Sequence, residues 1–355
     1  MIATITLNPS LDEHISVNGL IVDESNRWSR LKRYAGGKGI DVSRAIHEMG
    51  GVTTAYGFSG GAEGRALEIL LDEDGVSFSF TPIEQGTRTN FIITDTKTSQ
   101  QTRIGAPGPH ITHKELERFM RKIDELQPRP ALFVIGGSMP RGIPTDIYHN
   151  IVMRAKRYNI RTVLDSEGKW LVEGIKAKPY LIKPNAHEAG EILERSLENE
   201  EDVISAAIEF VKKGIEIAII SRGEEGIIAA TKDRIIKAVP PPVKIRSTVG
   251  AGDCTIAGFA LKLAYNDSLL EACRLGVAMG TAAVLTPGTE LCHKEDVEKI
   301  LPEVLVWEIP VNQRKKGFTA SNENSTVNQS KDANNEEATY KAGDSKGQFQ
   351  LKLIE

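Results

Sequence analysis

Short runs of β-branched and apolar residues alternate with helix-like stretches through most of this 355-residue chain. The clearest runs are residues 2–6 (IATIT), 131–137 (ALFVIGG), 161–165 (RTVLD), 179–183 (PYLIK) and 217–221 (IAIIS). Between the later runs, residues 146–158 and 201–214 place apolar side chains three and four positions apart, as in a helix that packs one face on a sheet. This alternation predicts βαβ units around a mostly parallel, buried sheet.

Two segments interrupt the alternation. Residues 14–35 and 87–106 alternate polar and apolar side chains around turn-like sequences, Asn18-Gly19 in the first and Asp95-Thr96-Lys97 in the second. Each pattern predicts a half-exposed antiparallel hairpin. We expect the two hairpins to form a small sheet outside the main fold.

The composition limits the partners and compartments that suit the chain. With 40% hydrophobic and 26% charged residues it is ordinary for a globular protein, and its net charge of −4 offers no positive field to nucleic acid or to an anionic membrane. No apolar run approaches the roughly 20 residues of a membrane span. The cysteines are too widely separated for a disulfide framework or a zinc site, which favours a cytoplasmic location; they are Cys254, Cys273 and Cys292.

Residues 311–355 are rich in Asn, Ser, Lys, Glu and Gln, and this composition predicts a disordered tail.

Residues 247–254 (STVGAGDC) place a glycine turn directly before an apolar, helix-like stretch. Glycines let a backbone approach a ligand closely, and the free N–H groups of a helix N-terminus attract anions. Asp253 in this turn could cap the helix or take part in chemistry, and the pattern alone leaves both open. A GxGxxG motif is lacking, and Lys38 in GGKG is followed by glycine rather than Ser or Thr, which disfavours a dinucleotide-binding dehydrogenase and a P-loop NTPase.

Other segments suit phosphate and polar ligands. Residues 36–46 (GGKGIDVSRAI) form a second glycine turn before a helix and carry Lys38, while Arg88 and Asn90 share one face of the second hairpin. The alternative for each is a solvated surface residue. Three polar loops follow predicted strands, where open α/β sheets bind their ligands: GSMPRG (137–142), KPNAHE (183–188) and SRGEEG (221–226).

Taken in their order, NPSLD, GGKGIDVSRA, TRTN, GSMPRG, KPNAHE, SRGEEG and STVGAGDC, these motifs resemble the ribokinase/PfkB family of sugar kinases, in its phosphosugar-kinase branch. The resemblance covers about residues 1–305. VPPPVKIRSTVGAGD and residues 274–292 are similar to the minor, B-type 6-phosphofructokinases, whereas GGKG and residues 105–111 are similar to 1-phosphofructokinases and tagatose-6-phosphate kinases.

The resemblance implies a ribokinase-like α/β fold: a doubly wound, mostly parallel sheet with helices on both faces and a small β-sheet lid. The kinase domain would span 1–310, with the lid from about 10–35 and 86–106. Lids of this kind often form a dimer clasp, so a homodimer through the lid is expected.

The resemblance also implies a role for particular residues. Asp253 would act as base toward the acceptor hydroxyl, beside an anion hole formed by Gly250, Ala251 and Gly252. The phosphosugar would be bound by Asp12, Gly37, Lys38, Asp41, Arg88, Asn90 and Ser138. ATP would be bound by Lys183, Asn185, Ser221, Gly223, Gly226 and Ser247. Glu188 would orient Mg²⁺ through water, and a monovalent cation such as K⁺ is a further expected cofactor.

The function implied is ATP-dependent phosphorylation of a ketohexose phosphate, with fructose 6-phosphate ahead of fructose 1-phosphate and tagatose 6-phosphate. A non-catalytic sugar-phosphate sensor is the alternative of another class, because Asp41 stands where the family usually has Asn and Cys254 where it usually has Ser. We expect the helix N-terminus to lower the pKa of Asp253. Cys254 is expected to be a small buried residue, with an oxidisable thiol of lowered pKa as the alternative.

Overall fold

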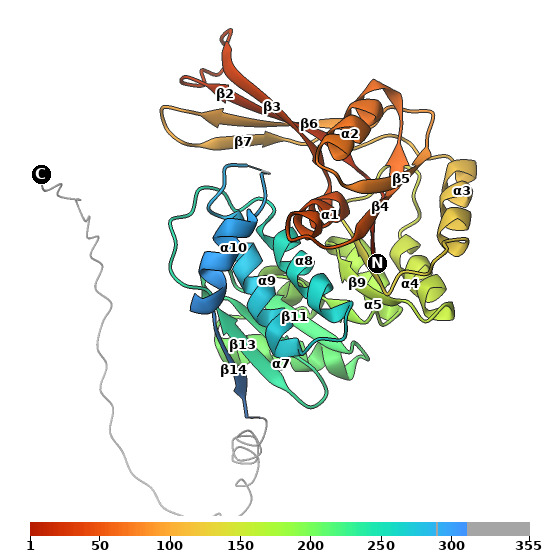
Figure 1. The fold of residues 1–355 in the computed structure, drawn as a ribbon, viewed down its shortest axis with the longest axis vertical. Coiled ribbons are helices and arrows are strands. Elements are labelled where there is room, and N and C mark those ends of the chain that lie inside the picture. Colours follow the sequence, from red (N-terminus) through yellow and green to blue (C-terminus); the bar gives the residue numbers. More distant parts are fainter. Residues whose placement is uncertain (289, 311–355) are drawn as a thin grey trace, which may run out of the picture. The chain divides into compact units, whose positions relative to one another are not determined.

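A ten-stranded sheet forms the centre of the described residues, 1–288 and 290–310, in a computed structural model (Figure 1). Across the sheet the strands are β14 (Leu305–Ile309), β13 (Ile235–Val239), β12 (Ile227–Ala230), β11 (Ile217–Ser221), β10 (Leu181–Ile182), β9 (Arg161–Asp165), β8 (Leu132–Gly136), β1 (Ile2–Thr6), β4 (Thr53–Ser59) and β5 (Ser77–Pro82). The strands from β5 to β11 run parallel, and β12, β13 and β14 continue the sheet antiparallel. The mostly parallel sheet predicted by the sequence is therefore confirmed. The predicted tail, 311–355, lies outside the described residues.

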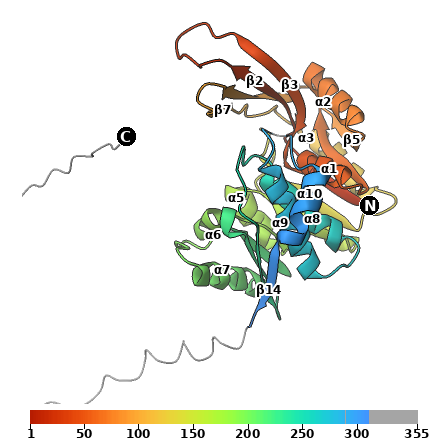
Figure 2. The ribbon, with the colours of Figure 1, turned by 60° about the vertical axis from the view of Figure 1, so that its left-hand side comes forward.

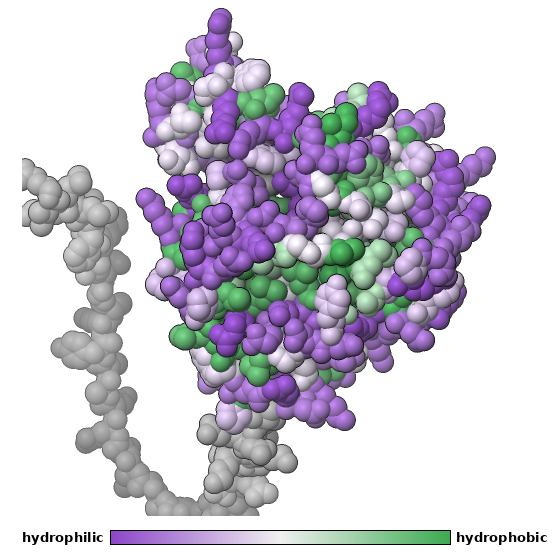
Figure 3. All heavy atoms as spheres, viewed as in Figure 1, coloured by the Kyte–Doolittle hydropathy of each residue, from purple (hydrophilic) through white to green (hydrophobic). Residues whose placement is uncertain are grey.

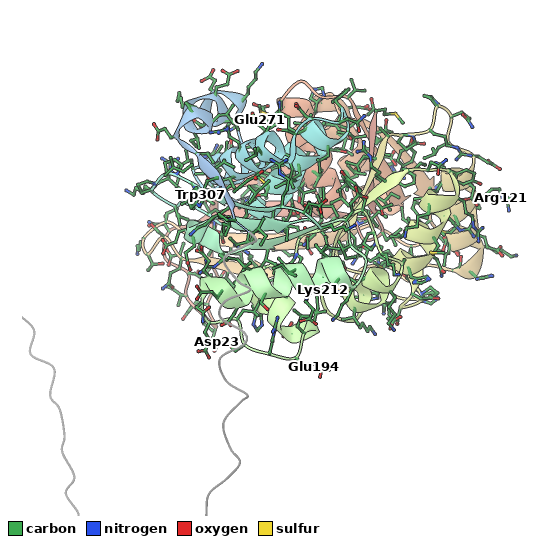
Figure 4. All side chains as sticks on the ribbon, turned by 90° about the horizontal axis from the view of Figure 1, so that it is seen from below. Asp23, Arg121, Glu194, Lys212, Glu271 and Trp307 are labelled. Atoms are coloured by element: carbon green, nitrogen blue, oxygen red, sulfur yellow. The ribbon has the colours of Figure 1, made fainter. Side chains whose placement is uncertain are left out.

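Helices cover both faces of this sheet. One face carries α1 (Lys38–Glu48), α8 (Ala251–Leu263), α9 (Leu269–Ala283) and α10 (Lys294–Ile300). The other carries α3 (His113–Asp124), α4 (Ile147–Arg157), α5 (Gly168–Lys176), α6 (Ala186–Ile192) and α7 (Glu200–Lys212). Figure 4 shows Glu271 on α9 and Lys212 on α7 on opposite sides of the sheet.

Two hydrophobic cores follow from the alternation of side chains along each strand. In β8, Leu132 and Val134 enter the core beneath α8 and α9, whereas Phe133 and Ile135 enter the core beneath α3 and α4. The parallel strands are buried on both faces, which explains why their sequences are continuously apolar. Because these strands are parallel, their carboxyl ends lie along the same edge of the sheet.

The two predicted hairpins form a separate four-stranded sheet, in the order β3 (Trp28–Gly36), β2 (Ser10–Val17), β6 (Arg88–Asp95) and β7 (Gln101–Ile104) (Figures 1 and 2). Within each hairpin the strands are antiparallel, but β2 and β6 pair in parallel and join the hairpins. Helix α2 (Gly61–Glu73) packs Leu67 and Leu71 against Ala35 of β3 and Phe80 of β5.

Polar residues cover most of the face drawn in Figure 3, and apolar residues gather across its middle. Within 1–288 and 290–310, no helix combines the length and apolar character needed to cross a bilayer.

Candidate active site

Two helices begin beside each other at the carboxyl ends of the parallel strands. The N-cap of α1 is Gly37, with φ of 116°, and the N-cap of α8 is Gly250, with φ of 77°; neither N-cap residue makes a side-chain capping hydrogen bond. A Cβ at Gly37 would lie 2.7 Å from the Thr6 Cγ2 atom, so this turn requires glycine on two counts. Because the first N–H groups of a helix lack internal acceptors, the paired helix starts form a site suited to anions.

Asp165, the last residue of β9, holds two lysines at this point. Its carboxylate accepts a hydrogen bond from Lys38 Nζ at 3.0 Å, and Lys183 Nζ lies 3.9 Å away. Burial alone would raise the pKa of Asp165, but the charges of Lys183 and Lys38 hold it below its usual value. Burial would also lower the pKa of Lys38, yet Asp165, Asp253 and Glu188 raise it. Lys38 is therefore a fixed positive charge.

Asp253 is the third residue of α8, and Gly250 holds the capping position. The structure thus removes the interpretation of Asp253 as the helix cap. The expected lowering of its pKa is also wrong: burial, the largest influence, raises the pKa of Asp253 to about 6 despite the positive charge of Lys38. At neutral pH this carboxylate is ionised and is a stronger base than an exposed aspartate.

The small sheet contributes Asp12, Arg88 and Asn90. Asp12 Oδ1 accepts hydrogen bonds from Ser10 Oγ at 2.7 Å and from Asn90 Nδ2 at 2.9 Å. Arg88 donates to the Ala106 carbonyl at 2.9 Å; burial raises the pKa of Asp12, and the charge of Arg88 offsets part of this rise. The pairing of β2 with β6 thus brings together three of the residues predicted to bind the phosphosugar.

Ser138 follows β8 and meets Asn8, which follows β1. Asn8 Nδ2 donates to Ser138 Oγ at 3.1 Å. Among the described residues, five buried side-chain atoms lack a hydrogen-bond partner, and four belong to this region: Asn8 Oδ1, Asp41 Oδ1, Arg88 Nε and Asp165 Oδ1. Buried polar atoms without partners are costly in a folded protein, and their convergence here indicates the place of a polar ligand.

Sequence reasoning missed Asp165 and Asn8 as site residues. Asp165 ends the strand predicted at 161–165, and Asn8 stands in the NPSLD motif two residues after β1. The available signal was their position, because polar residues at the carboxyl ends of neighbouring parallel strands converge. Assigning them required knowing which strands are adjacent in the sheet.

A pocket of about 500 Å³ is lined in part by Lys183 and Gly252. Of the residues predicted to bind ATP, Lys183, Ser221, Gly223 and Gly226 line it, together with Ala251 and Gly252. Its apolar walls are Ile227, Pro240, Pro241, Pro242, Val243, Ile245, Val277 and Val284. A Cβ at Gly226 would lie 1.9 Å from the Ala238 carbonyl oxygen, so only glycine fits this turn.

Asn185 and Ser247 are outside the lining of this pocket. Asn185 caps α6: its side chain accepts from the Glu188 N–H at 2.8 Å, and Glu188 Oε2 accepts from the Asn185 N–H at 2.9 Å. Ser247 is buried and its Oγ accepts from the Val249 N–H at 3.2 Å. Both residues therefore have structural tasks at the margin of the pocket.

Glu188 has the chemistry needed to orient Mg²⁺. Its charge raises the pKa of Lys38, so its carboxylate faces the charged centre. In the described ranges, no cluster of three or more His, Cys, Asp or Glu side chains could hold a metal. A single carboxylate at the rim fits Mg²⁺, which keeps several waters and binds through substrate phosphates.

Cys254 is buried beside Cys292. Burial, followed by the neighbouring thiol, raises the pKa of Cys254 well above its usual value. The interpretation as a small buried residue is confirmed, and the reactive thiol of lowered pKa is wrong because the side chain enters the core beneath α8 and not the cleft.

Comparisons with known proteins agree with this arrangement. A family model for pfkB family carbohydrate kinases matches residues 5–296. The chain is 35% identical to a Bacillus subtilis 1-phosphofructokinase over 86% of this chain and 99% of the relative, and 35% identical to the Escherichia coli ATP-dependent 6-phosphofructokinase isozyme 2 over 84% and 97%. It is also 34% identical to a Staphylococcus epidermidis tagatose-6-phosphate kinase over 87% and 100%.

Among solved structures, Escherichia coli phosphofructokinase-2 in complex with potassium is similar, with a TM-score of 0.82, 34% identity, and coverage of 85% of this chain and 98% of that one. The fold, the site and these relatives define an ATP-dependent sugar kinase, a phosphotransferase. The chain belongs to the pfkB family of carbohydrate kinases and, within it, to the sugar-phosphate kinases. The sensor alternative is thereby set aside.

Proposed function

We propose that this kinase transfers the γ-phosphoryl group of ATP to fructose 6-phosphate and releases fructose 1,6-bisphosphate and ADP. The observation that carries the reaction type is the junction of α1 and α8, where Lys38, Asp165 and Asp253 meet beside the nucleotide-sized pocket. The choice of acceptor is supported by residues 239–253 and 274–292, which are similar to the B-type 6-phosphofructokinases.

The chemical step follows from these positions. The acceptor hydroxyl oxygen bonds to the γ-phosphorus, the bond to the β–γ bridging oxygen breaks, and Asp253 accepts the hydroxyl proton. The amides at Gly250, Ala251 and Gly252 and the ammonium of Lys38 face the charge of the transferred oxygens. Such a loose transition state requires mainly alignment and positive potential, which helix starts supply without reorganisation.

The remaining groups bind the two substrates. Asp12, Arg88, Asn90 and Ser138 hold the phosphosugar, and the pocket lined by Lys183, Ser221, Gly223 and Gly226 holds ATP. Asn185 and Ser247 support the nucleotide site from its margin. Glu188 would hold Mg²⁺ through water, and the ion would supply positive charge to the phosphates of ATP.

Further parts of the proposal rest on relatives and composition. The potassium complex of the Escherichia coli relative supports a monovalent cation as an additional cofactor. We place the kinase domain at residues 1–310 and propose a homodimer through the small sheet, which exposes Trp28 at the start of β3 and Val22 in the loop between β2 and β3. The three free cysteines favour a reducing, cytoplasmic location.

Fructose 1-phosphate and tagatose 6-phosphate are the second candidate acceptors. Lys38 in GGKG and residues 105–111 are similar to the kinases of these sugars. Fructose 1-phosphate yields the same bisphosphate with the ketose reversed in the cleft.

An acceptor panel tests the proposal. We expect kcat/KM to be highest for fructose 6-phosphate, followed by fructose 1-phosphate and tagatose 6-phosphate, with free fructose far lower. Arg88→Ala should raise KM for the phosphorylated acceptors by about tenfold or more, because a charge-assisted contact to phosphate is lost. Arg103→Ala, at an exposed position of the same small sheet, is the matched control and should change little. Equal losses with free and phosphorylated sugars would remove Arg88 from the phosphate site, and turnover of free sugars alone would refute the proposed acceptor.

A further inference from the structure

Asp41 is a buried carboxyl group to which the chemical step assigns no proton. It lies in the first turn of α1, three residues after Lys38, and is 7% exposed. Its Oδ1 atom is buried without a hydrogen-bond partner. Like Asp165 Oδ1, it is a carboxyl oxygen near the cleft that the folded chain leaves without a hydrogen bond.

Two further carboxyl groups face Asp41 from other elements, Asp253 from α8 and Asp12 from β2. Burial raises the pKa of Asp12, and the hydrogen bonds from Ser10 and Asn90 and the charge of Arg88 only partly offset this rise. Asp253 is ionised at neutral pH. A negative charge at Asp41 would therefore be opposed by the carboxyl groups of Asp253 and Asp12 in a poorly solvated site.

Arg44, one turn further along α1, is the cation that faces Asp41. Its Nη1 atom lies 3.6 Å from Asp41 Oδ1, too far for a hydrogen bond. The guanidinium is held elsewhere, because Nε donates to Asp74 at 2.9 Å and Nη1 donates to the Ala35 carbonyl at 3.3 Å. The compensation that Arg44 offers to a charged Asp41 is therefore incomplete.

The other elements packed on α1 add little charge near Asp41. β1 and β8 carry no titratable residue, and Tyr56 of β4 is directed into the core on the opposite face of the sheet. On β3, Tyr34 stacks on Arg44 and Lys32 pairs with Glu290. Burial first and Asp253 second raise the pKa of Asp41 well above its ordinary value, in agreement with this geometry.

We propose that Asp41 carries a proton in the working enzyme and donates it in a hydrogen bond to a hydroxyl oxygen of the acceptor sugar. In this state a carboxyl group supplies the donor that an amide would supply at the same position. Asp41 is thus a specificity-determining residue whose contribution depends on pH. The inference rests on the proposed sugar-phosphate acceptor.

The sign of the pH effect follows directly. As pH rises, Asp253 loses its proton first and becomes competent as a base, so kcat rises. Under the proposal, Asp41 loses its proton at higher pH, where this loss removes the donor and adds a further negative charge to the cleft. Acceptor KM should therefore increase in alkaline solution, while the nucleotide KM, set in the pocket beyond Lys183, should not.

The test compares wild type, Asp41→Asn and Asp41→Ala in steady-state kinetics at saturating MgATP, from about pH 5 to 9. Wild type should show an acceptor KM that rises by about tenfold in the alkaline limb, the value of one hydrogen bond. Asp41→Asn keeps a neutral hydrogen-bond donor at every pH, so its acceptor KM should not rise in alkaline solution. Asp41→Ala lacks the donor and should show a raised acceptor KM at every pH.

Infrared spectroscopy of the substrate-free proteins supplies a readout independent of activity. The band of a protonated carboxyl should persist in wild type at pH 7, disappear in alkaline solution, and be missing from Asp41→Asn. Absence of the band from wild type, or an alkaline limb retained by Asp41→Asn, would overturn the inference. Lack of turnover with every hexose phosphate would instead refute the proposed function. If the Asn variant failed to fold, loss of the same band in Asp41→Ala would assign it to Asp41.

Discussion

The N-termini of α1 and α8 both begin at a glycine with a positive φ, but their first turns carry opposite charges. Each directs its charged residue to the cleft. On α1 the charge is Lys38, which opposes the positive end of the helix dipole and is held by Asp165. On α8 the charge is Asp253, whose carboxylate makes no hydrogen bond to a described residue. One helix start therefore presents a fixed charge, and the other presents a group that can gain and lose a proton.

Asp253→Asn should break this comparison with the largest effect. The amide keeps the shape of the side chain but cannot accept the hydroxyl proton, so we expect kcat to fall by at least about 10²-fold with little change in either KM. In wild type, kcat should fall as pH drops through about 6, where Asp253 takes up a proton. If the residual kcat of Asp253→Asn also falls as pH drops through about 6, a group other than Asp253 is responsible for this pH dependence.

The same substitution should stabilise the fold. The pKa of Asp253 is raised from 3.8 to about 6 in the folded protein, so the folded state binds the proton more tightly and loses stability as pH rises between these values. At pH 7 the free energy of unfolding of Asp253→Asn should therefore exceed that of wild type by about 1–3 kcal/mol. Its unfolding temperature should be correspondingly higher. Below about pH 4 the two proteins should be nearly equal. Chemical denaturation at both pH values checks the sign.

Lys38→Met should have the next largest effect. Loss of the fixed charge should lower kcat/KM for the phosphosugar by about tenfold to a hundredfold, the range for a charge-assisted hydrogen bond. Asp165 keeps only Lys183, at 3.9 Å, so stability should fall as well. Lys176→Met, which removes an exposed pair with Glu173, is the control and should leave kcat/KM unchanged. Equal activity of the two variants would show that Lys38 is only structural.

The smallest predicted effect on activity is that of Asn185→Ala, at a helix N-terminus that is capped by side-chain hydrogen bonds. Asn185 on α6 and Asn199 on α7 each form a capping box, but only Asn185 stands beside the proposed nucleotide site. Replacing either with alanine should cost about 1 kcal/mol of stability. Only Asn185→Ala should also raise KM for ATP, by a few-fold. Unchanged KM in both variants would restrict Asn185 to its capping task.

Much of the fold could be predicted because its strands are sharply bounded in the sequence. β1, β9 and β11 have the residues predicted for them, since buried parallel strands read as continuous apolar runs. β10 is shorter than predicted, with only Leu181 and Ile182 in the sheet; Pro179 and Pro184 flank it, and neither has an N–H for the ladder. The antiparallel extension through β12–β14 was not predicted, as short strands at a sheet edge carry a weak periodic signal.

The site was less predictable where it depends on tertiary packing. Glycine turns and their order led to Lys38 and Asp253, but the pKa of Asp253 was expected to shift in the wrong direction because a helix N-terminus is visible in a sequence and burial is not. Asp165 was missed for a related reason. Its two lysines come from segments more than 100 and fewer than 20 residues away, and only the strand order brings all three together.

The parallel pairing of β2 with β6 has a mechanical consequence. The register sets Ser10 opposite Arg88 and Asp12 opposite Asn90, so residues far apart in the chain occupy two adjacent rows of one sheet. A movement of that sheet as one unit would leave these four side chains in the same positions relative to one another. Under the proposed function, a single displacement would therefore both enclose the phosphosugar and align the groups that recognise it.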